Sequence, residues 1–140
     1  MITAWKHKRT ALLLWPFSIV FRIIVTMRTY LYRLGILPSV ALDARVICVG
    51  NITVGGTGKT PLVLYISTLL RASGHRVAVI SRGYRGGTNN VVPVSDGTAV
   101  LSTPEDAGDE PYMIAGKLDR IPVASGSRRA EAGQFVIDQY

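Results

Sequence analysis

The chain has 140 residues, 48% of them hydrophobic, and a mean hydropathy of +0.27. A chain of this length can build one modest core, and the composition excludes an intrinsically disordered protein. The single cysteine, Cys48, excludes a disulfide framework. Its place in the apolar run Val46–Val49 predicts a buried strand position, in a protein of a reducing compartment.

The net charge of +7 is concentrated near the N-terminus. No acidic residue precedes Asp43, whereas six basic residues do: Lys6, Lys8, Arg9, Arg22, Arg28 and Arg33. A basic chain can bind nucleic acid. Here, however, the basic residues are interleaved with large apolar ones, which suits an anionic bilayer better than a phosphate backbone. We therefore predict an anionic membrane surface as a partner, and no nucleic acid.

Residues 6–37 are predicted to form one amphipathic helix that ends at Gly35 and Pro38. Its polar residues lie in a narrow stripe at 3.6 residues per turn: Ser18, Arg22, Thr26, Thr29 and Arg33. The uncharged run Thr10–Phe21 has 12 residues, fewer than the roughly 20 that a spanning helix needs. We favour a helix in the membrane interface; a tilted spanning anchor and a helix packed inside the protein stay open.

A strand–helix–strand pattern follows, so we divide the chain into a basic helix with its hinge, residues 1–42, and an incomplete α/β core, residues 43–140. Alternating strands and helices predict a mostly parallel sheet with flanking helices, of the P-loop NTPase type. The predicted elements are a strand at 45–49, a glycine-rich turn at 51–58, a helix at 59–72, a strand at 76–80, a loop at 81–90, one or two short strands within 91–101, a helix at 104–117, a strand at 121–124 and a helix at 128–140.

The first of these helices is expected to bury one apolar face, formed by Leu62, Val63, Ile66, Leu69 and Leu70. Gly74 is its predicted stop.

The strongest motif is the run Thr53, Val54, Gly55, Gly56, Thr57, Gly58, Lys59 and Thr60. Glycines allow backbone N–H groups to turn toward phosphate oxygens, and the following helix directs its positive end at them. Lys59 is predicted to contact the β- and γ-phosphates of ATP, and the Thr60 hydroxyl to bind Mg²⁺. ATPases of the partitioning type carry a lysine just before the glycine pair, and Val54 at that position argues against that class.

Three shorter runs allow two interpretations each from the residues alone. Ser81–Arg85 follows a strand, where Arg and Tyr side chains can hold phosphate or sugar oxygens, or simply form a loop. Gly108–Pro111 opens a helix, where Asp109 and Glu110 suit a helix cap or a general base with an acidic neighbour near a metal. Ser127–Arg129 suits a solvated helix end or a phosphate clamp.

Together and in this order, the runs Val49–Pro61, Ser81–Tyr84 and Gly108–Pro111 closely resemble the tetraacyldisaccharide 4′-kinase family, the lipid A 4′-kinases of Gram-negative bacteria. The resemblance covers essentially the whole chain. It implies ATP- and Mg²⁺-dependent phosphate transfer to the 4′-hydroxyl of the lipid A disaccharide precursor, tetraacyldisaccharide 1-phosphate, to give lipid IVA. It also implies a place at the cytoplasmic face of the bacterial inner membrane.

The resemblance assigns roles to single residues. Asp109 matches the catalytic base, Glu110 its acidic neighbour near the metal, and three residues match positions lining the cleft: Arg82, Tyr84 and Arg129. Family chains continue into a strand that supplies the Walker B carboxylates and into a C-terminal domain. We therefore expect the N-terminal part of such a kinase, poorly active alone. A membrane-associated nucleotide-binding module without phosphotransfer is the alternative.

Overall fold

The computed structural model describes residues 8–51, 58–83 and 90–140, which form two compact units, Met1–Ala41 and Leu42–Tyr140. In the first unit, the helix predicted over 6–37 is observed as α1 (Lys8–Arg33), with Pro16 inside it. Gly35 follows with a φ of 71°, and Ile36 N–H donates to the Leu31 carbonyl, so the predicted stop at Gly35 is confirmed.

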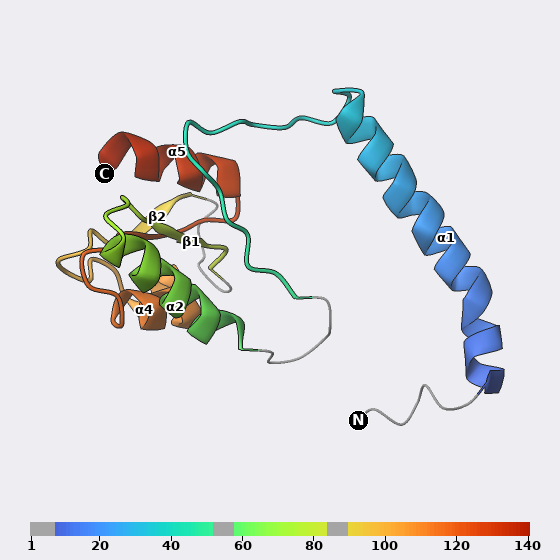
Figure 1. The fold of residues 1–140 in the computed structure, drawn as a ribbon, viewed down its shortest axis with the longest axis horizontal. Helices are drawn as coiled ribbons and strands as arrows, with labels where there is room; N and C mark the ends of the chain where they lie inside the picture. Colours follow the sequence, from blue (N-terminus) through green and yellow to red (C-terminus); the bar gives the residue numbers. More distant parts are fainter. Residues whose placement is uncertain (1–7, 52–57, 84–89) are drawn as a thin grey trace. The chain divides into compact units, whose positions relative to one another are not determined.

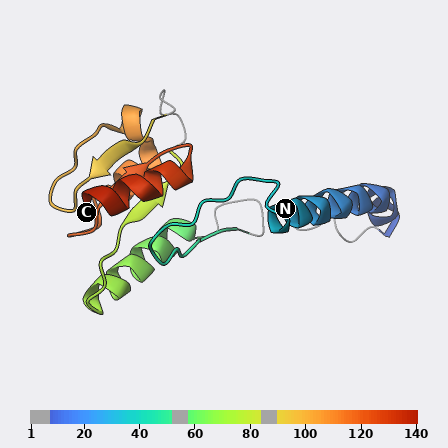
Figure 2. The ribbon, with the colours of Figure 1, turned by 90° about the horizontal axis from the view of Figure 1, so that it is seen from above.

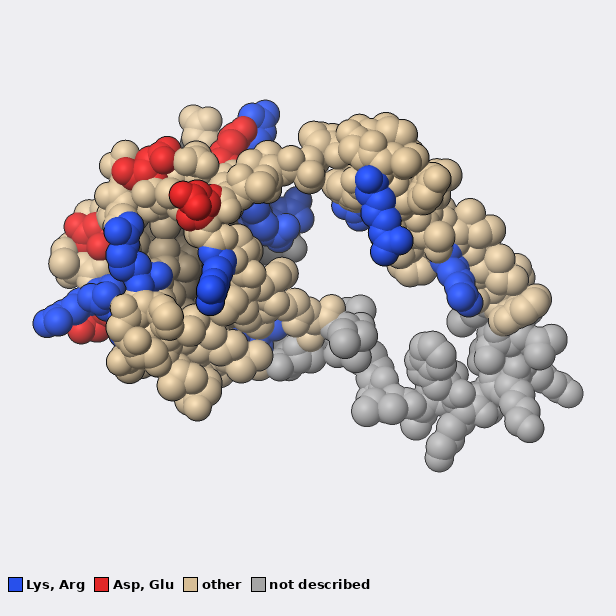
Figure 3. All heavy atoms as spheres, turned by 45° about the horizontal axis from the view of Figure 1, so that its top comes forward, with Lys and Arg blue, Asp and Glu red and all other residues tan. Residues whose placement is uncertain are grey.

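The described apolar side chains of α1 are largely exposed, among them Trp15, Phe17 and Phe21. The Arg28 guanidinium lies 5.7 Å from the centre of the Tyr32 ring, within the range of a cation–π contact. Figure 3 shows basic side chains, in blue, among uncharged residues, in tan, on this helix. Of the helices that the structure describes, none combines the length and the apolar character that crossing a bilayer requires.

The second unit is built on a three-stranded sheet in the order β1 (Val79–Ser81), β3 (Val123–Ser125), β2 (Val92–Ser95). α5 (Arg129–Gln139) covers one face, and α2 (Lys59–Ala72) and α4 (Asp109–Ala115) lie on the other (Figure 1). Seen from above, α5 lies over the strands (Figure 2). Between sheet and α4 lies the core: Val79, Val94, Ala107, Ile114, Ala115, Leu118, Ile121 and Val123.

The sheet is mixed, so the prediction of a mostly parallel sheet is wrong for the described strands. β1 pairs with β3 in parallel, but β2 pairs with β3 antiparallel. The reason is an additional reversal of the chain at residues 95–100, where Ser95 bridges Val100 and Leu101 N–H donates to the Val94 carbonyl. β2 is thus the first arm of a hairpin and runs against its neighbour, which strand–helix alternation does not reveal.

Asp96 stabilises that reversal through its side chain. One carboxylate oxygen accepts hydrogen bonds from Thr98 N–H, Thr98 Oγ1 and Ala99 N–H at 2.7 to 2.8 Å. These bonds, that of the Ala99 backbone first, favour the charged form and lower the pKa of Asp96 below its usual 3.8. The turn that was predicted around Ser95, Asp96 and Gly97 is confirmed.

The strand predicted over Arg45–Val49 is not observed. Val46 and Ile47 are 71% and 60% exposed, and Cys48, predicted to be buried, is exposed as well. A strand must pair its backbone groups with a neighbour, and none of the described strands pairs with this segment. The apolar character of this segment predicted a strand, but it does not indicate which neighbouring strand would pair with it.

The predicted apolar face of α2 is confirmed only in part. Val63 and Leu64 pack against the core, whereas Leu62 and Leu69 are 48% and 52% exposed. Apolar residues lie on nearly every side of this helix, so their periodicity alone does not identify the buried ones. The packing of α2 against α4 determines which residues are buried. The helix bounds and the stop at Gly74, where φ is 84°, agree with the prediction.

Candidate functional site

The N-terminus of α2 is the first component of the site. Gly58 precedes the helix in the left-handed conformation, with a φ of 75°, and no side chain caps the helix there. Lys59 and Thr60 are half-buried in the first turn. The first N–H groups of a helix have no partner within it and carry partial positive charge, so this end suits an anion. The predicted phosphate-loop residues Thr53, Val54, Gly55, Gly56 and Thr57 lie outside the described residues.

The second component is a sharp corner at Gly108. The helix predicted over 104–117 is broken there into α3 (Pro104–Ala107) and α4, because Gly108 has φ 92° and ψ 151°. That conformation is almost restricted to glycine. Asp109 and Glu110 are the first two residues of α4, and both are exposed.

The capping interpretation of Asp109 does not describe this corner. Gly108 holds the N-cap position, no side chain caps α4, and Asp109 is already a helical residue. Within the described part of the chain, its carboxylate makes no hydrogen bond or ion pair. Its negative charge at a helix N-terminus is favourable, but the group remains available to a ligand.

The two components meet at a side-chain contact. The Thr60 hydroxyl donates a hydrogen bond of 2.8 Å to a carboxylate oxygen of Glu110, 50 residues away in the sequence. The two residues predicted to lie near a metal are therefore brought together. Sequence spacing gives no sign of this contact, because it depends on α4 packing beside α2.

A buried serine, Ser125, fixes the corner to the sheet, and sequence reasoning missed it. It is the last residue of the central strand β3, and its hydroxyl donates a hydrogen bond of 3.0 Å to the Ala107 carbonyl. Its only signal in the sequence is its position directly after the strand predicted at 121–124.

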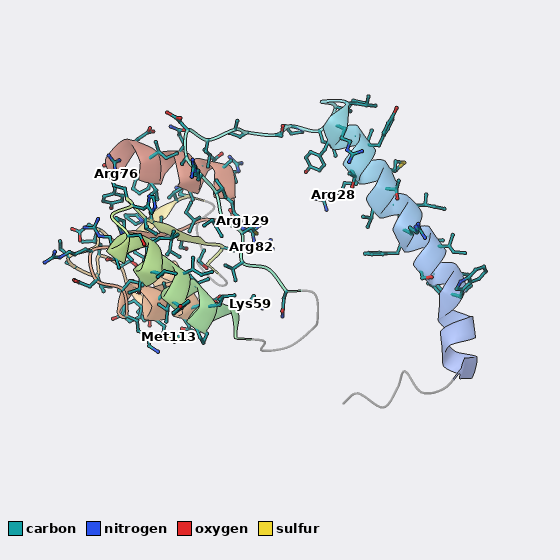
Figure 4. All side chains as sticks on the ribbon, in the orientation of Figure 1. Arg28, Lys59, Arg76, Arg82, Met113 and Arg129 are labelled. Carbon is teal, nitrogen blue, oxygen red and sulfur yellow. The ribbon has the colours of Figure 1, made fainter. Side chains whose placement is uncertain are left out.

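Cationic side chains leave from the same edge of the sheet. Arg82 comes directly after β1 and Arg129 opens α5 after β3, and both are exposed. Figure 4 shows them at the end of the sheet where Lys59 begins α2. Arg128 instead pairs with Glu131 at 2.8 Å, and this hydrogen bond raises the pKa of the arginine. Tyr84, also predicted to line the cleft, lies outside the described residues.

The arrangement can therefore hold an anion at a helix N-terminus, with further cations and two carboxylates at the same edge. A family model described as tetraacyldisaccharide-1-P 4′-kinase matches residues 10–140. The chain belongs to the tetraacyldisaccharide 4′-kinase family. The resemblance expected from the three short motifs is confirmed.

Individual relatives agree with this membership of the 4′-kinase family. The tetraacyldisaccharide 4′-kinases of Syntrophus aciditrophicus and Pelobacter propionicus are 47% and 44% identical over 92% and 91% of this chain. A crystal structure described as the apo form of LpxK from Aquifex aeolicus in complex with ATP superposes with a TM-score of 0.77 at 36% identity, covering 90% of this chain and 39% of that one. The chain spans about 35% of the length of the curated relatives.

The strained corner at Gly108 yields a first prediction. Replacing Gly108 by Ala should lower the free energy of unfolding by roughly 1–3 kcal/mol, because a Cβ is disfavoured at a φ of 92°. Gly116→Ala is the matched control at the other end of α4, where φ is −69° and the nearest atoms to a new Cβ are 3.7 and 3.9 Å away. Denaturant unfolding compares the two variants, and equal effects would contradict the assigned backbone strain.

Proposed function

We propose that this chain provides the ATP-binding and catalytic residues of a tetraacyldisaccharide 4′-kinase. The reaction transfers the γ-phosphate of ATP to the 4′-hydroxyl of tetraacyldisaccharide 1-phosphate and gives lipid IVA. Family membership supports this function, as does a structural relative described as a complex with ATP. The observation that carries the proposal is the contact between Thr60 and Glu110, which joins the nucleotide-binding helix to the corner bearing Asp109.

The N-terminus of α2 is the proposed phosphate site. Lys59 contributes a cation beside the uncapped N–H groups of the first turn, which together favour the β- and γ-phosphates. Arg82 and Arg129 add positive charge at the same edge. Together with Tyr84, these arginines are proposed to line the cleft for the disaccharide and its phosphate.

The residues present fit a Mg²⁺ ion. Adjacent oxygen ligands of an octahedral ion with bonds of 2.0–2.1 Å are about 2.9 Å apart, and the Thr60 and Glu110 oxygens are separated by 2.8 Å. No three Asp, Glu, His or Cys side chains cluster as metal ligands within residues 8–51, 58–83 and 90–140, so ATP phosphates or water must complete the set. When bound, the ion neutralises charge on the transferring phosphate.

Asp109 is the proposed general base. Its exposed carboxylate lies next to Glu110 in the chain and is free to accept the proton of the 4′-hydroxyl. That proton leaves as the oxygen attacks the γ-phosphorus and the bond to the β-phosphate oxygen breaks. Lys59 and the arginines hold the phosphates in place during this step.

We also propose that α1 attaches the protein to the cytoplasmic face of the inner membrane. The helix exposes large apolar side chains such as Trp15 and Phe21, and its unit, Met1–Ala41, contains no Asp or Glu. Apolar burial and attraction to anionic lipid then act together. The excess positive charge lies on the same segment as the exposed apolar side chains. This supports a membrane surface rather than nucleic acid as the partner.

The phosphate site is tested by nucleotide affinity. Lys59→Ala should raise the dissociation constant of Mg·ATP at least tenfold, which is about 1.4 kcal/mol, because a cation beside the phosphates is lost. Lys117→Ala is the control, since Lys117 lies at the hairpin end of the fold with Gly97 and Thr98. Isothermal titration calorimetry measures both. An unchanged affinity for Mg·ATP in Lys59→Ala would contradict the proposed role of Lys59 in binding the phosphates.

The base is tested by turnover in a full-length 4′-kinase that contains this chain. Asp109→Asn keeps the shape but not the basicity, so turnover should fall by roughly 10²–10⁴-fold, with ATP affinity and melting temperature retained. Asp119→Asn, at an exposed carboxylate after α4, should leave turnover unchanged. Equal turnover in Asp109→Asn would contradict the proposed base. ATP binding without turnover in the wild type would instead favour a nucleotide-binding module.

Membrane attachment is tested by sedimentation with vesicles. Removing residues 1–37 should move the protein from the pellet of phosphatidylglycerol vesicles to the supernatant, because the exposed apolar side chains and the basic residues are lost together. High salt alone should release the full chain poorly, since apolar burial is not screened. The shortened chain must keep its melting transition; if it still sediments with lipid, α1 is not the anchor.

A further inference from the structure

The hydroxyl of Ser125 lies where three segments of the fold meet. Ser125 ends the central strand, is 3% exposed, and donates a hydrogen bond of 3.0 Å to the Ala107 carbonyl. Its backbone is registered with Ser81 at the end of β1, and Gly126 N–H donates to the Ser81 carbonyl at 2.9 Å. The side chain thus joins the parallel pair of strands to the end of α3.

Gly83 closes this junction from a third side. Its φ is 63°, and a Cβ built there would collide with Ser125 Oγ and come within 2.8 Å of the Ala107 carbonyl oxygen. The backbone therefore approaches the serine hydroxyl more closely than any residue with a side chain allows. The loop after β1, the end of β3 and the corner after α3 are packed on one buried polar atom.

Each of these segments leads directly to a residue of the site. Gly83 follows Arg82, Ala107 is followed by Gly108, Asp109 and Glu110, and β3 leads within four residues to Arg129. A shift of the Ala107 carbonyl moves Gly108 and hence the start of α4. The contact between Glu110 and Thr60 depends on that start.

We propose that Ser125 is a positioning residue, whose hydroxyl fixes the Gly108 corner so that Glu110 meets Thr60 at the N-terminus of α2, with Asp109 next to it in the chain. It acts through the Ala107 carbonyl, to which its hydroxyl donates. The catalytic part of this inference rests on the proposed kinase function, but the positioning part does not. The buried hydroxyl satisfies a carbonyl at a helix end, where no intrahelical donor is available.

The same sheet provides a matched control. Ser95 is also 3% exposed and ends β2, and its hydroxyl likewise bonds to backbone, accepting from Gly97 N–H at 3.0 Å. It pairs with Val123, at the opposite end of β3 from Ser125. Loss of either hydroxyl removes one buried side-chain to backbone hydrogen bond, but only one of them lies at the site.

Amide hydrogen exchange in this chain tests the positioning. Ser125→Ala should speed exchange at least tenfold at Gly108 N–H and Tyr112 N–H, which donate to the Pro104 and Gly108 carbonyls. Ser95→Ala should leave both amides at wild-type rates. Unchanged exchange in Ser125→Ala, or equal acceleration in both variants, overturns the proposal whether or not the protein is a kinase. If Ser125→Ala fails to fold, Ser125→Cys, a weaker donor, is judged by the same amides and by the same criteria.

Turnover in a full-length 4′-kinase containing this chain tests the catalytic consequence. Ser125→Ala should lower kcat on the order of 10²-fold and leave KM for ATP within twofold, with Ser125→Cys between it and the wild type. Ser95→Ala should change neither constant, although its melting temperature falls similarly. Equal kcat losses in Ser125→Ala and Ser95→Ala overturn the catalytic part. If the wild type shows no turnover, the proposed kinase function is refuted. The positioning role of Ser125 is then tested by amide hydrogen exchange alone.

Discussion

Parallel pairing of β1 with β3 brings the carboxyl ends of both strands to one edge of the sheet, and the candidate site is built from what leaves that edge. Arg82 follows one strand and Arg129 the other. α2 runs toward the amino end of β1 before the chain enters that strand, so its N-terminus lies at the same edge. Residues scattered over 70 positions of sequence therefore face one region because two short strands run the same way.

The polarity of that edge follows from two helix starts that meet there. α2 and α4 both begin after a glycine with positive φ, and neither has a side-chain cap. One start carries Lys59 and Thr60, and the other carries Asp109 and Glu110. The two helix starts are joined by one hydrogen bond, from the Thr60 hydroxyl to the Glu110 carboxylate. In the proposed kinase, a phosphate would accept from the free N–H groups at the start of α2, and a divalent cation would bind the Glu110 carboxylate at the start of α4.

At the opposite edge of the sheet, side-chain and backbone contacts hold the hairpin after β2 together. The Asp96 carboxylate closes the hairpin, Gly97 packs against the backbone at Arg120, and Arg120 N–H donates to the Gly97 carbonyl at 2.8 Å. This reversal allows the chain to return along β2 and begin α3 at the functional edge. The antiparallel strand, which departs from the simple βαβ pattern, is the means by which the Gly108 corner reaches its position.

The sequence by itself determined the family and the bounds of α1, α2 and α5 to within a few residues, and it supplied the candidate residues of the site. These depend on local signals: a glycine-rich run, helical periodicity, and short motifs in a fixed order. It could not determine that residues 45–49 form no strand, which face of α2 is buried, or the direction of β2, because each depends on which neighbour supplies hydrogen bonds or apolar contact. Only the tertiary structure placed Glu110 on Thr60 and Ser125 beneath the corner, since both contacts join segments that are distant in the chain.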